Sequence, residues 1–143
     1  MRKNGKVLTG VVAFCLILIV TSTVWAAGLF PDGTVTTGNL VWLQDADSFG
    51  RLTWDQAASQ VHNLASGSHG LSDGSKPGDW HLPTKSELES RVRNVSGFNN
   101  VSSEYYWSNT TEGSQAWAVS ANYPSGKINK GNVNHVWPVR SIK

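Results

Sequence analysis

The sequence predicts one small α+β domain that is exported from the cell. Three observations carry this prediction. The first 26 residues join a basic start to an apolar run, the middle of the chain holds two helix-capping patterns, and aromatic and β-branched runs separated by turn residues follow. Strands, then helices, then strands again are the order typical of an α+β domain.

Residues 1–26 have the parts of a cleavable signal peptide. Three basic residues and no acid precede an apolar run, and small residues lead to Ala26. We expect cleavage before Ala27, which leaves a single domain over 27–143. The alternative is a retained membrane anchor, but the apolar run of about 14 residues is shorter than the roughly 20 that a spanning helix needs. The prediction is therefore an exported protein, either periplasmic or extracellular at the cell surface, with no membrane association after cleavage.

Cysteine content and net charge predict a domain without disulfides and without a nucleic-acid partner. The lone cysteine, Cys15, lies in the apolar run, so the mature domain is predicted to be free of disulfides. The signal peptide holds three of the twelve basic residues and none of the ten acidic ones, which leaves a mature charge of about −1. A net charge near zero gives no general attraction to nucleic acid, and we expect no nucleic-acid partner. Six tryptophans remain to fill the core.

Local patterns predict the first elements of the mature chain. Short β-rich runs bounded by turn residues predict strands at 33–36 and 40–44. A capping-box pattern followed by an apolar stripe predicts a helix over 54–65. A second capping box, in which Thr84 is the N-cap, predicts a helix that ends near Arg93.

The rest of the chain reads as loops and strands. The turn-forming residues of 66–79 predict a long exposed loop, of a length that is often functional or mobile. A hairpin is predicted to join 116–122 to 127–130. Aromatic and β-branched runs predict three strands, at 105–108, 116–120 and 135–140.

Five short motifs follow one another along the mature chain. They are Trp54-x-x-Ala57, Trp80-His81-Leu82-Pro83-Thr84-x-x-Glu87-Leu88, Tyr106-Trp107-Ser108-x-Thr110, Ala116-Trp117 and Val136-Trp137-Pro138-Val139-Arg140. Over about residues 33–142, this series resembles the C-terminal domain of the Legionella collagen-like adhesin, a bacterial family also catalogued as a domain of unknown function.

The resemblance implies a C-type-lectin-like fold, with two helices packed on a small twisted antiparallel sheet and chain ends that lie near each other. It also implies an exported surface or periplasmic protein, and the adhesin of this family binds sulfated glycans. At the matching motif positions it implies structural roles for Trp54, Trp80, Leu82, Pro83, Thr84, Glu87, Leu88, Trp107, Trp117 and Arg140.

The chain departs from the family pattern at a few positions. His81 stands where the family usually has Arg, and Trp137 replaces the first Arg of the closing motif. Many members carry two cysteines at positions that match Val61 and Pro138 here, so both partners of that bridge are missing together. The absence of the bridge leaves the predicted fold intact.

The mature sequence offers little for catalysis or metal binding. It has no thiol nucleophile, no HExxH, no GxSxG and no phosphate-binding loop. His81 could act as a base, although a structural replacement for Arg is favoured. Asp73 and Asp79 could bind calcium through oxygen ligands, but the calcium motifs of C-type lectins are missing. We expect no enzyme activity, no cofactor and no metal.

A polar and aromatic cluster near the predicted 116–130 hairpin is the candidate ligand site. Two lysines beside a tyrosine and several amides would suit an acidic or sulfated glycan, although an ordinary polar hairpin is the alternative. Trp137 joins the candidates because it departs from the family pattern, whereas the motif tryptophans are most simply core residues. The candidate residues are Asn122, Tyr123, Lys127, Asn129, Lys130 and Trp137, with Asn132 and Asn134 nearby.

These observations favour an exported, noncatalytic binding domain that recognises glycans or another surface polymer. The alternative is a structural or accessory subunit of a surface filament or envelope assembly, which would bind a protein partner or form a homo-oligomer. An enzyme is a third class, and it would require a bound metal or cofactor.

Overall fold

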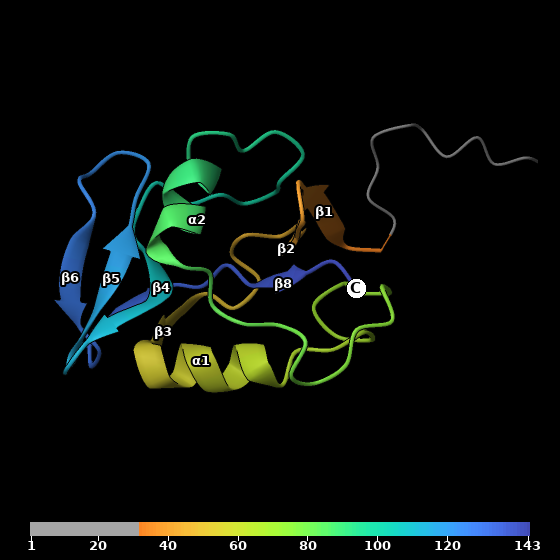
Figure 1. Ribbon diagram of the computed structural model, residues 1–143, viewed down its shortest axis with the longest axis horizontal. Coiled ribbons are helices and arrows are strands. Elements are labelled where there is room, and N and C mark those ends of the chain that lie inside the picture. Colours follow the sequence, from red (N-terminus) through yellow and green to blue (C-terminus); the bar gives the residue numbers. More distant parts are fainter. Residues whose placement is uncertain (1–31) are drawn as a thin grey trace, which may run out of the picture.

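The computed structural model describes residues 32–143, so the predicted signal peptide and Cys15 lie outside the described residues. Two helices and eight strands in this part confirm the α+β class (Figure 1). The elements in chain order are β1 (Thr34–Thr37), β2 (Leu40–Leu43), β3 (Arg51–Thr53), α1 (Trp54–His62), α2 (Lys85–Arg91), β4 (Tyr106–Glu112), β5 (Gln115–Val119), β6 (Gly126–Asn129), β7 (Val133–His135) and β8 (Val139–Ser141).

The strands form two sheets rather than the single antiparallel sheet that was predicted. One sheet has the order β1-β2-β8 and the other has the order β3-β7-β4-β5-β6. The pairs within them are antiparallel except β4 with β7, which run parallel. Because β1 and β8 belong to the same small sheet, the first and last strands of the domain lie close together (Figure 1).

The predicted strand over 135–140 is wrong, since this segment is shared between the two sheets. β7 ends at His135 and β8 begins at Val139. Pro138 has no N–H for a ladder, and its carbonyl accepts a hydrogen bond from the Leu43 N–H at 3.1 Å instead. The chain therefore crosses from one sheet to the other through buried residues.

Both helices begin where the sequence predicts and end earlier. Thr53 caps α1 and Thr84 caps α2, each with a complete capping box. In α2 the Glu87 carboxylate accepts a hydrogen bond from the Thr84 N–H at 2.8 Å. α1 ends at His62 rather than Ala65, and α2 ends at Arg91 rather than Arg93. The starts depend on local hydrogen bonds, whereas the ends depend on where the chain must turn.

The two helices cover opposite faces of the five-stranded sheet (Figure 1). Along a strand successive side chains point to opposite faces. Ala116 and Ala118 of β5 pack in one buried cluster with Ala57 of α1, whereas Val119 packs in a second with Leu88 of α2. Trp117 alternates with the two alanines, which puts its side chain on the α2 face.

The 66–79 loop is tied to its surroundings by backbone hydrogen bonds. Gly78 N–H donates to the His62 carbonyl at 2.7 Å, and Ser72 N–H donates to the Asp32 carbonyl at 3.0 Å. Much of the loop is exposed, as predicted, but Leu71 is 3% exposed and belongs to the core cluster beneath α1. The loop is therefore part of the packed domain.

Candidate ligand-binding groove

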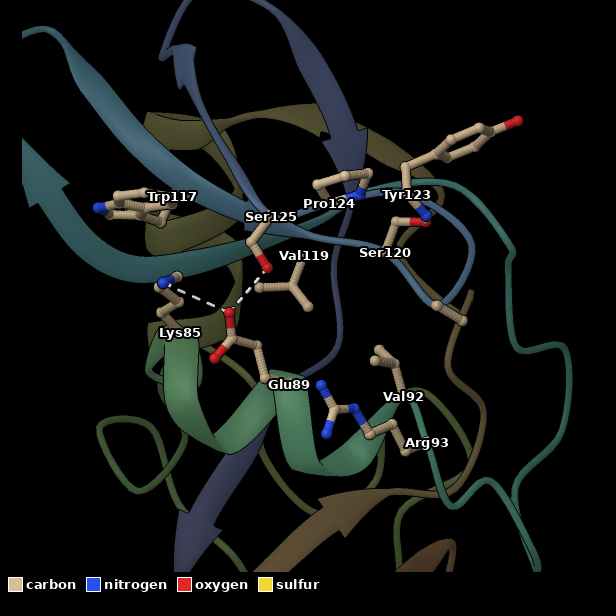
Figure 2. Close-up of a pocket in the computed structure, with 11 residues that line it drawn as sticks. Lys85, Glu89, Val92, Arg93, Trp117, Val119, Ser120, Tyr123, Pro124 and Ser125 are labelled. Atoms are coloured by element: carbon tan, nitrogen blue, oxygen red, sulfur yellow. Dashed lines mark hydrogen bonds and ion pairs between the residues drawn. The ribbon is translucent and has the colours of Figure 1, made fainter.

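A pocket of about 430 Å³ lies between α2 and the turn that joins β5 to β6 (Figure 2). We call it the α2–hairpin groove. One wall comes from α2 and the other from the exposed end of the hairpin. It is lined by Lys85, Glu89, Val92, Arg93, Trp117, Val119, Ser120, Ala121, Tyr123, Pro124 and Ser125.

Trp117 forms an aromatic surface at one end of this groove. Its indole is only partly buried, because the α2 helix begins beside it rather than over it. The ammonium group of Lys85 lies 4.2 Å from the ring centre, and that of Lys127 lies 5.9 Å away. Lys127 is also paired with Glu112 at 3.0 Å. An indole beside two cations offers both an apolar face and positive charge to a ligand.

Tyr123 forms a second exposed aromatic surface, at the opposite end (Figure 2). Its side chain is 51% exposed, and its ring stacks on Tyr105 with 6.1 Å between the ring centres. The hydroxyl of Ser120 accepts hydrogen bonds from the N–H groups of Asn122 and Tyr123, at 3.0 and 3.2 Å. The Tyr105 hydroxyl donates to the Pro124 carbonyl at 2.9 Å. These contacts fix the turn and so the position of Tyr123.

The charged residues of the groove differ in their partners. Glu89 accepts a hydrogen bond from the Ser125 hydroxyl at 2.8 Å and pairs with Lys85 at 3.4 Å. The Ser125 hydrogen bond is the main reason that the pKa of Glu89 lies below its ordinary value, and Lys85 adds to it. Arg93 is exposed, and its guanidinium points back along α2 toward Glu89 (Figure 2). It makes no hydrogen bond or ion pair with the residues that the structure describes.

The groove can therefore hold a polar, anionic ligand. The lining includes two cations, Lys85 and Arg93, against one carboxylate, Glu89. Two aromatic rings at its ends suit the C–H faces of sugar rings or other flat groups, and Arg93 suits an acidic substituent because a guanidinium binds planar anions in a bidentate way.

The structure brings together part of the predicted hairpin cluster. Tyr123 lines the groove, Asn122 lies in the same turn, and Lys127 stands opposite Trp117 in the β5–β6 register. Asn129 and Lys130 lie at the far end of β6, where Lys130 is 4.5 Å from the ring centre of Trp54. The Asn129 side chain accepts a hydrogen bond from the Gly131 N–H.

Two of the amides in the predicted cluster also lie outside the groove. Asn134 is buried, and its side-chain amide nitrogen has no hydrogen-bond partner within residues 32–143. Asn132 is exposed in the turn before β7.

Trp137 was predicted as a surface candidate, and this prediction is wrong. Its side chain is 0% exposed, and its indole N–H donates to the Leu43 carbonyl at 2.9 Å. The ring packs edge-on against Trp42 and Phe98, with centres 5.5 and 4.8 Å apart. A neutral ring fills the space between the two sheets here, where a charged Arg would need a partner.

Sequence reasoning missed Lys85, Arg93 and Trp117 as site residues. Lys85 lies in a helix that was analysed only for its caps and apolar face, and Arg93 lies just after the end of that helix. Trp117 was assigned to the core because it sits in a family motif. One local signal could have indicated Trp117. Trp117 and Val119 are two residues apart, so they share one face of a strand whose end carries polar residues.

The residues assigned structural roles occupy packed or hydrogen-bonded positions. Pro83 accepts a hydrogen bond from the Asn109 N–H at 2.8 Å. Trp54 is only partly buried and donates its indole N–H to the Ser108 carbonyl at 2.8 Å. The members that are at most 3% exposed are Trp80, Leu82, Leu88 and Trp107.

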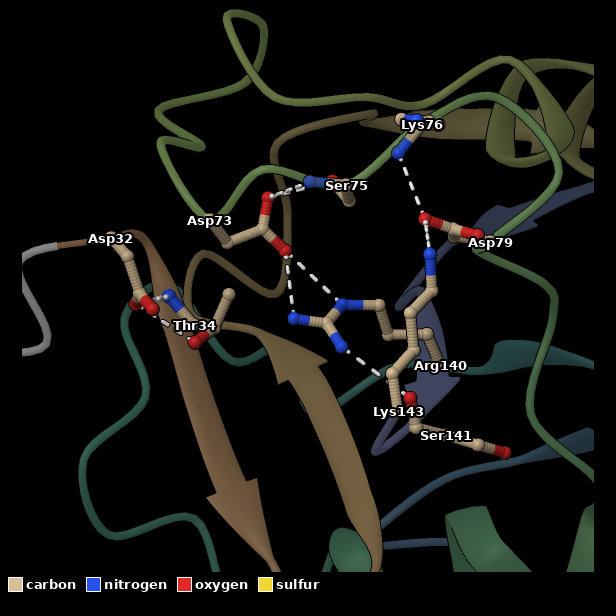
Figure 3. Close-up of polar contacts among 9 residues, drawn as sticks. All are labelled: Asp32, Thr34, Asp73, Ser75, Lys76, Asp79, Arg140, Ser141 and Lys143. Atoms are coloured by element: carbon tan, nitrogen blue, oxygen red, sulfur yellow. Dashed lines mark hydrogen bonds and ion pairs between the residues drawn. The ribbon is translucent and has the colours of Figure 1, made fainter.

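Arg140 of the closing motif holds the 66–79 loop (Figure 3). It pairs with Asp73 at 3.0 Å, and its guanidinium lies 5.4 Å from the ring centre of Trp80. The Asp73 side chain is 1% exposed and also accepts two hydrogen bonds from Ser75, at 3.1 and 2.6 Å. Burial raises the pKa of Asp73, but the hydrogen bonds from Ser75 and Arg140 outweigh it and hold the pKa below its ordinary value.

The other candidates in and near this loop have partners of a different kind. Asp79 pairs with Lys143 at 2.8 Å (Figure 3). Both carboxylates considered for calcium are thus paired with cations, and among residues 32–143 no group of three or more His, Cys, Asp or Glu could hold a metal ion. His81 is exposed, and its backbone forms a β-bridge with Val139.

The fold and the groove together define a small α+β domain. It has a surface pocket lined by aromatic and cationic residues, and its strands carry the sequence motifs described above. The chain belongs to the Lcl C-terminal domain family, whose pattern it matches over residues 34–140. No curated protein matches the chain. Neither helix of residues 32–143 has the length and apolarity that crossing a membrane requires.

Proposed function

We propose that this protein is an exported, noncatalytic binding domain that holds an acidic glycan or another anionic surface polymer in the α2–hairpin groove. Membership of the Lcl C-terminal domain family supports an adhesin-associated role. The C-type-lectin-like fold that the family resemblance implies is part of the same proposal. The observation that carries it is that Trp117, Tyr123 and the unpaired Arg93 line one groove.

The groove suits an extended ligand better than a small enclosed one. The two aromatic surfaces stand at its opposite ends, so each could stack on a separate unit of a polymer (Figure 2). Arg93 lies just after α2, beside Glu89 on which its charge acts, and its guanidinium has no hydrogen bond within residues 32–143 that would compete with an acidic group of a ligand. A glycan held by ring stacking and one charge-assisted contact would bind weakly at each domain, and several copies on a surface would add avidity.

The histidines that the structure describes lack the full set of partners that catalysis uses. The Ser48 hydroxyl lies 2.6 Å from Nδ1 of the exposed His69, but no carboxylate among residues 32–143 orients this imidazole. The mature chain has no thiol, and the imidazole of exposed His81 has no hydrogen-bond partner among residues 32–143 that could orient it as a base. His135 is oriented by Asp47 at 2.7 Å, but no hydroxyl nucleophile joins this pair within the described residues. We therefore propose binding rather than chemistry.

The test is a glycan array of the purified protein, run with calcium and again with chelator. We expect binding to acidic glycans that survives the chelator, because the proposed contacts are aromatic rings and cations. Arg93→Gln should weaken binding about tenfold, as expected for the loss of one charge-assisted hydrogen bond. Tyr123→Ser should weaken binding as well, since it removes an exposed ring.

Matched variants separate this groove from the rest of the surface. Arg51→Gln removes another exposed arginine and should leave binding unchanged, because Arg51 lies on β3. Lys130→Gln tests the other end of β6 in the same way. Binding lost with chelator would point instead to the Asp73–Asp79 loop and contradict the metal-free proposal.

Silence of the whole array would favour the alternative class, a structural subunit of a surface filament or envelope assembly. That class predicts concentration-dependent oligomers or co-purification with a filament protein, without affinity for glycans. An enzyme would show itself by a metal or cofactor in elemental or absorption analysis of the purified protein.

A further inference from the structure

Arg91 is a buried cation that has no carboxylate partner among residues 32–143. It lies in the last turn of α2 and is 8% exposed, with its guanidinium between the rings of Trp42 and Phe98 at 5.2 and 5.1 Å. Burial lowers the pKa of Arg91. The aromatic rings compensate for part of the lost hydration of this charge, but a buried charge is ordinarily paired as well as hydrogen-bonded.

The unpaired part of Arg91 is the edge that usually grips an anion. Its Nη1 group donates to the Asn94 carbonyl at 2.9 Å. Nε is buried and has no partner, and no hydrogen bond joins Nη2 to a residue of 32–143. Nε and Nη2 form one side of the planar guanidinium, and their parallel N–H bonds match the two oxygens of a carboxylate.

A second unpaired donor belongs to the same pocket. The indole N–H of Trp42 is buried without a hydrogen-bond partner in the part of the chain that the structure describes, and Trp42 is 1% exposed. Leaving a buried donor unpaired destabilises the folded protein, because the donor loses its hydrogen bond to water and gains none. Trp42 and Arg91 both line a pocket of about 380 Å³ between α2 and the β1–β2 turn. Two residues that line this pocket thus each carry a buried donor without an acceptor, and a small shift of the side chains beside them would let a ligand in the pocket reach these donors.

The walls of this pocket indicate the kind of acceptor. Leu40 and the ring of Trp42 supply apolar surface, which favours a carboxylate on an apolar body over a strongly hydrated inorganic anion. The exposed Ser86 and Ser90 supply hydroxyls at the rim. Glu87 also lines the pocket, and its carboxylate is held by the Thr84 N–H at 2.8 Å.

We propose that the pocket between α2 and the β1–β2 turn binds an organic carboxylate, held by the Nε–Nη2 edge of Arg91 and by the Trp42 indole N–H. This site is separate from the α2–hairpin groove, because the two pockets are lined by different residues of α2. The test of this carboxylate site is therefore independent of the test of the proposed function.

The test is a titration of the ¹⁵N-labelled protein with benzoate, followed by the NMR signals of the Arg91 Nε–H and the Trp42 indole N–H. We expect both signals to shift in a saturable way at millimolar benzoate. Benzamide, which has the same ring without the charge, and sulfate, which has charge without an apolar body, should give at least tenfold weaker responses. Equal responses to all three would overturn the proposal.

Two variants keep the test decisive. Arg91→Lys retains the charge but removes the bidentate edge, and we expect at least a tenfold loss of benzoate affinity. If that variant fails to fold, Ser90→Phe fills the pocket from an exposed helix position and should also abolish the shifts. Arg51→Lys changes an exposed arginine on β3, outside this pocket, and should titrate like the unchanged protein. An unchanged titration of Ser90→Phe would overturn the proposal, as would the absence of any shift in the unchanged protein.

Discussion

In the 66–79 loop, the Asp73 side chain is 1% exposed and accepts hydrogen bonds from Ser75 and Arg140. In the α2–hairpin groove, Arg93 is exposed and has no hydrogen bond or ion pair within the described part of the chain. The loop and the hairpin wall of the groove were candidates from sequence because both are polar and lie outside the apolar core, whereas Arg93 was not identified. The loop uses its charges to hold the domain together, whereas the groove leaves a charge and two aromatic rings available. Partners inside the fold, and not polarity itself, distinguish a structural region from a candidate binding site.

The strongest test of this comparison removes a charge from each region. Arg140→Ala leaves the Asp73 carboxylate buried without its cation, and we expect a loss of about 3 kcal/mol in the free energy of unfolding. Arg93→Ala should change that free energy by less than about 0.5 kcal/mol, as is usual for an exposed side chain. Urea unfolding followed by tryptophan fluorescence measures both. Similar losses in the two variants would contradict the distinction.

A glycine pair tests how tightly the loop is packed on the small sheet. Gly33 has φ +78°, and a Cβ at this position would lie 2.4 Å from the Gly70 carbonyl oxygen. Gly38 has φ +61° with nothing within 4 Å. Gly38→Ala should cost about 1 kcal/mol of stability through backbone strain alone, and Gly33→Ala should cost about 2 kcal/mol or more because backbone atoms must also move. Thermal or urea unfolding compares the two, and equal costs would show that the loop yields easily.

Acid should loosen the loop through Asp73. Its pKa lies below the ordinary value of 3.8 in the folded protein, so the unfolded chain binds more protons in the window at and below that value. Stability from this group is therefore present above pH 3.8 and is lost as the pH falls through the folded pKa. Asp73→Asn should flatten the acid limb of a plot of unfolding free energy against pH. Asp79 and Glu89 share the same direction of shift, so some slope should remain.

The smallest expected effect concerns the lysine at the groove. Lys85→Met removes an exposed ion pair with Glu89 and a cation–π contact with Trp117. We expect a stability loss of about 0.5–1 kcal/mol, although glycan binding should fall more clearly. Urea unfolding measures the change in the free energy of unfolding, and the glycan array on the same preparation measures the change in binding. A large stability loss with unchanged binding would place Lys85 with the structural charges.

Much of the local structure was predictable because it depends on neighbours in the sequence. The Thr53–Gln56 and Thr84–Glu87 capping boxes were read correctly as the starts of the two helices. The β5–β6 hairpin was also predicted, since turn residues separate two runs of β-formers. β3 was missed because three residues are too few to show an alternating pattern, and its partner β7 is far away in the sequence.

The candidate site was only partly predictable. The hairpin residues Tyr123 and Lys127 were identified, but the opposite wall of the groove comes from α2, and no local pattern shows which face of α2 meets the hairpin. Asn129 and Lys130 were grouped with them because they are close in sequence, although an extended strand carries them to its other end.

The sequence by itself determined the class of fold, the helix starts, the hairpin and the motifs of the family, because each rests on a short-range pattern. Only the tertiary structure decided that Trp137 fills the space between two sheets while Trp117 keeps part of its ring in the groove. Burial of the apolar ring area stabilises the fold in the same way for every tryptophan. Which of them remain accessible depends on where the second sheet, the helices and the loop leave a surface uncovered, and that geometry joins residues far apart along the chain.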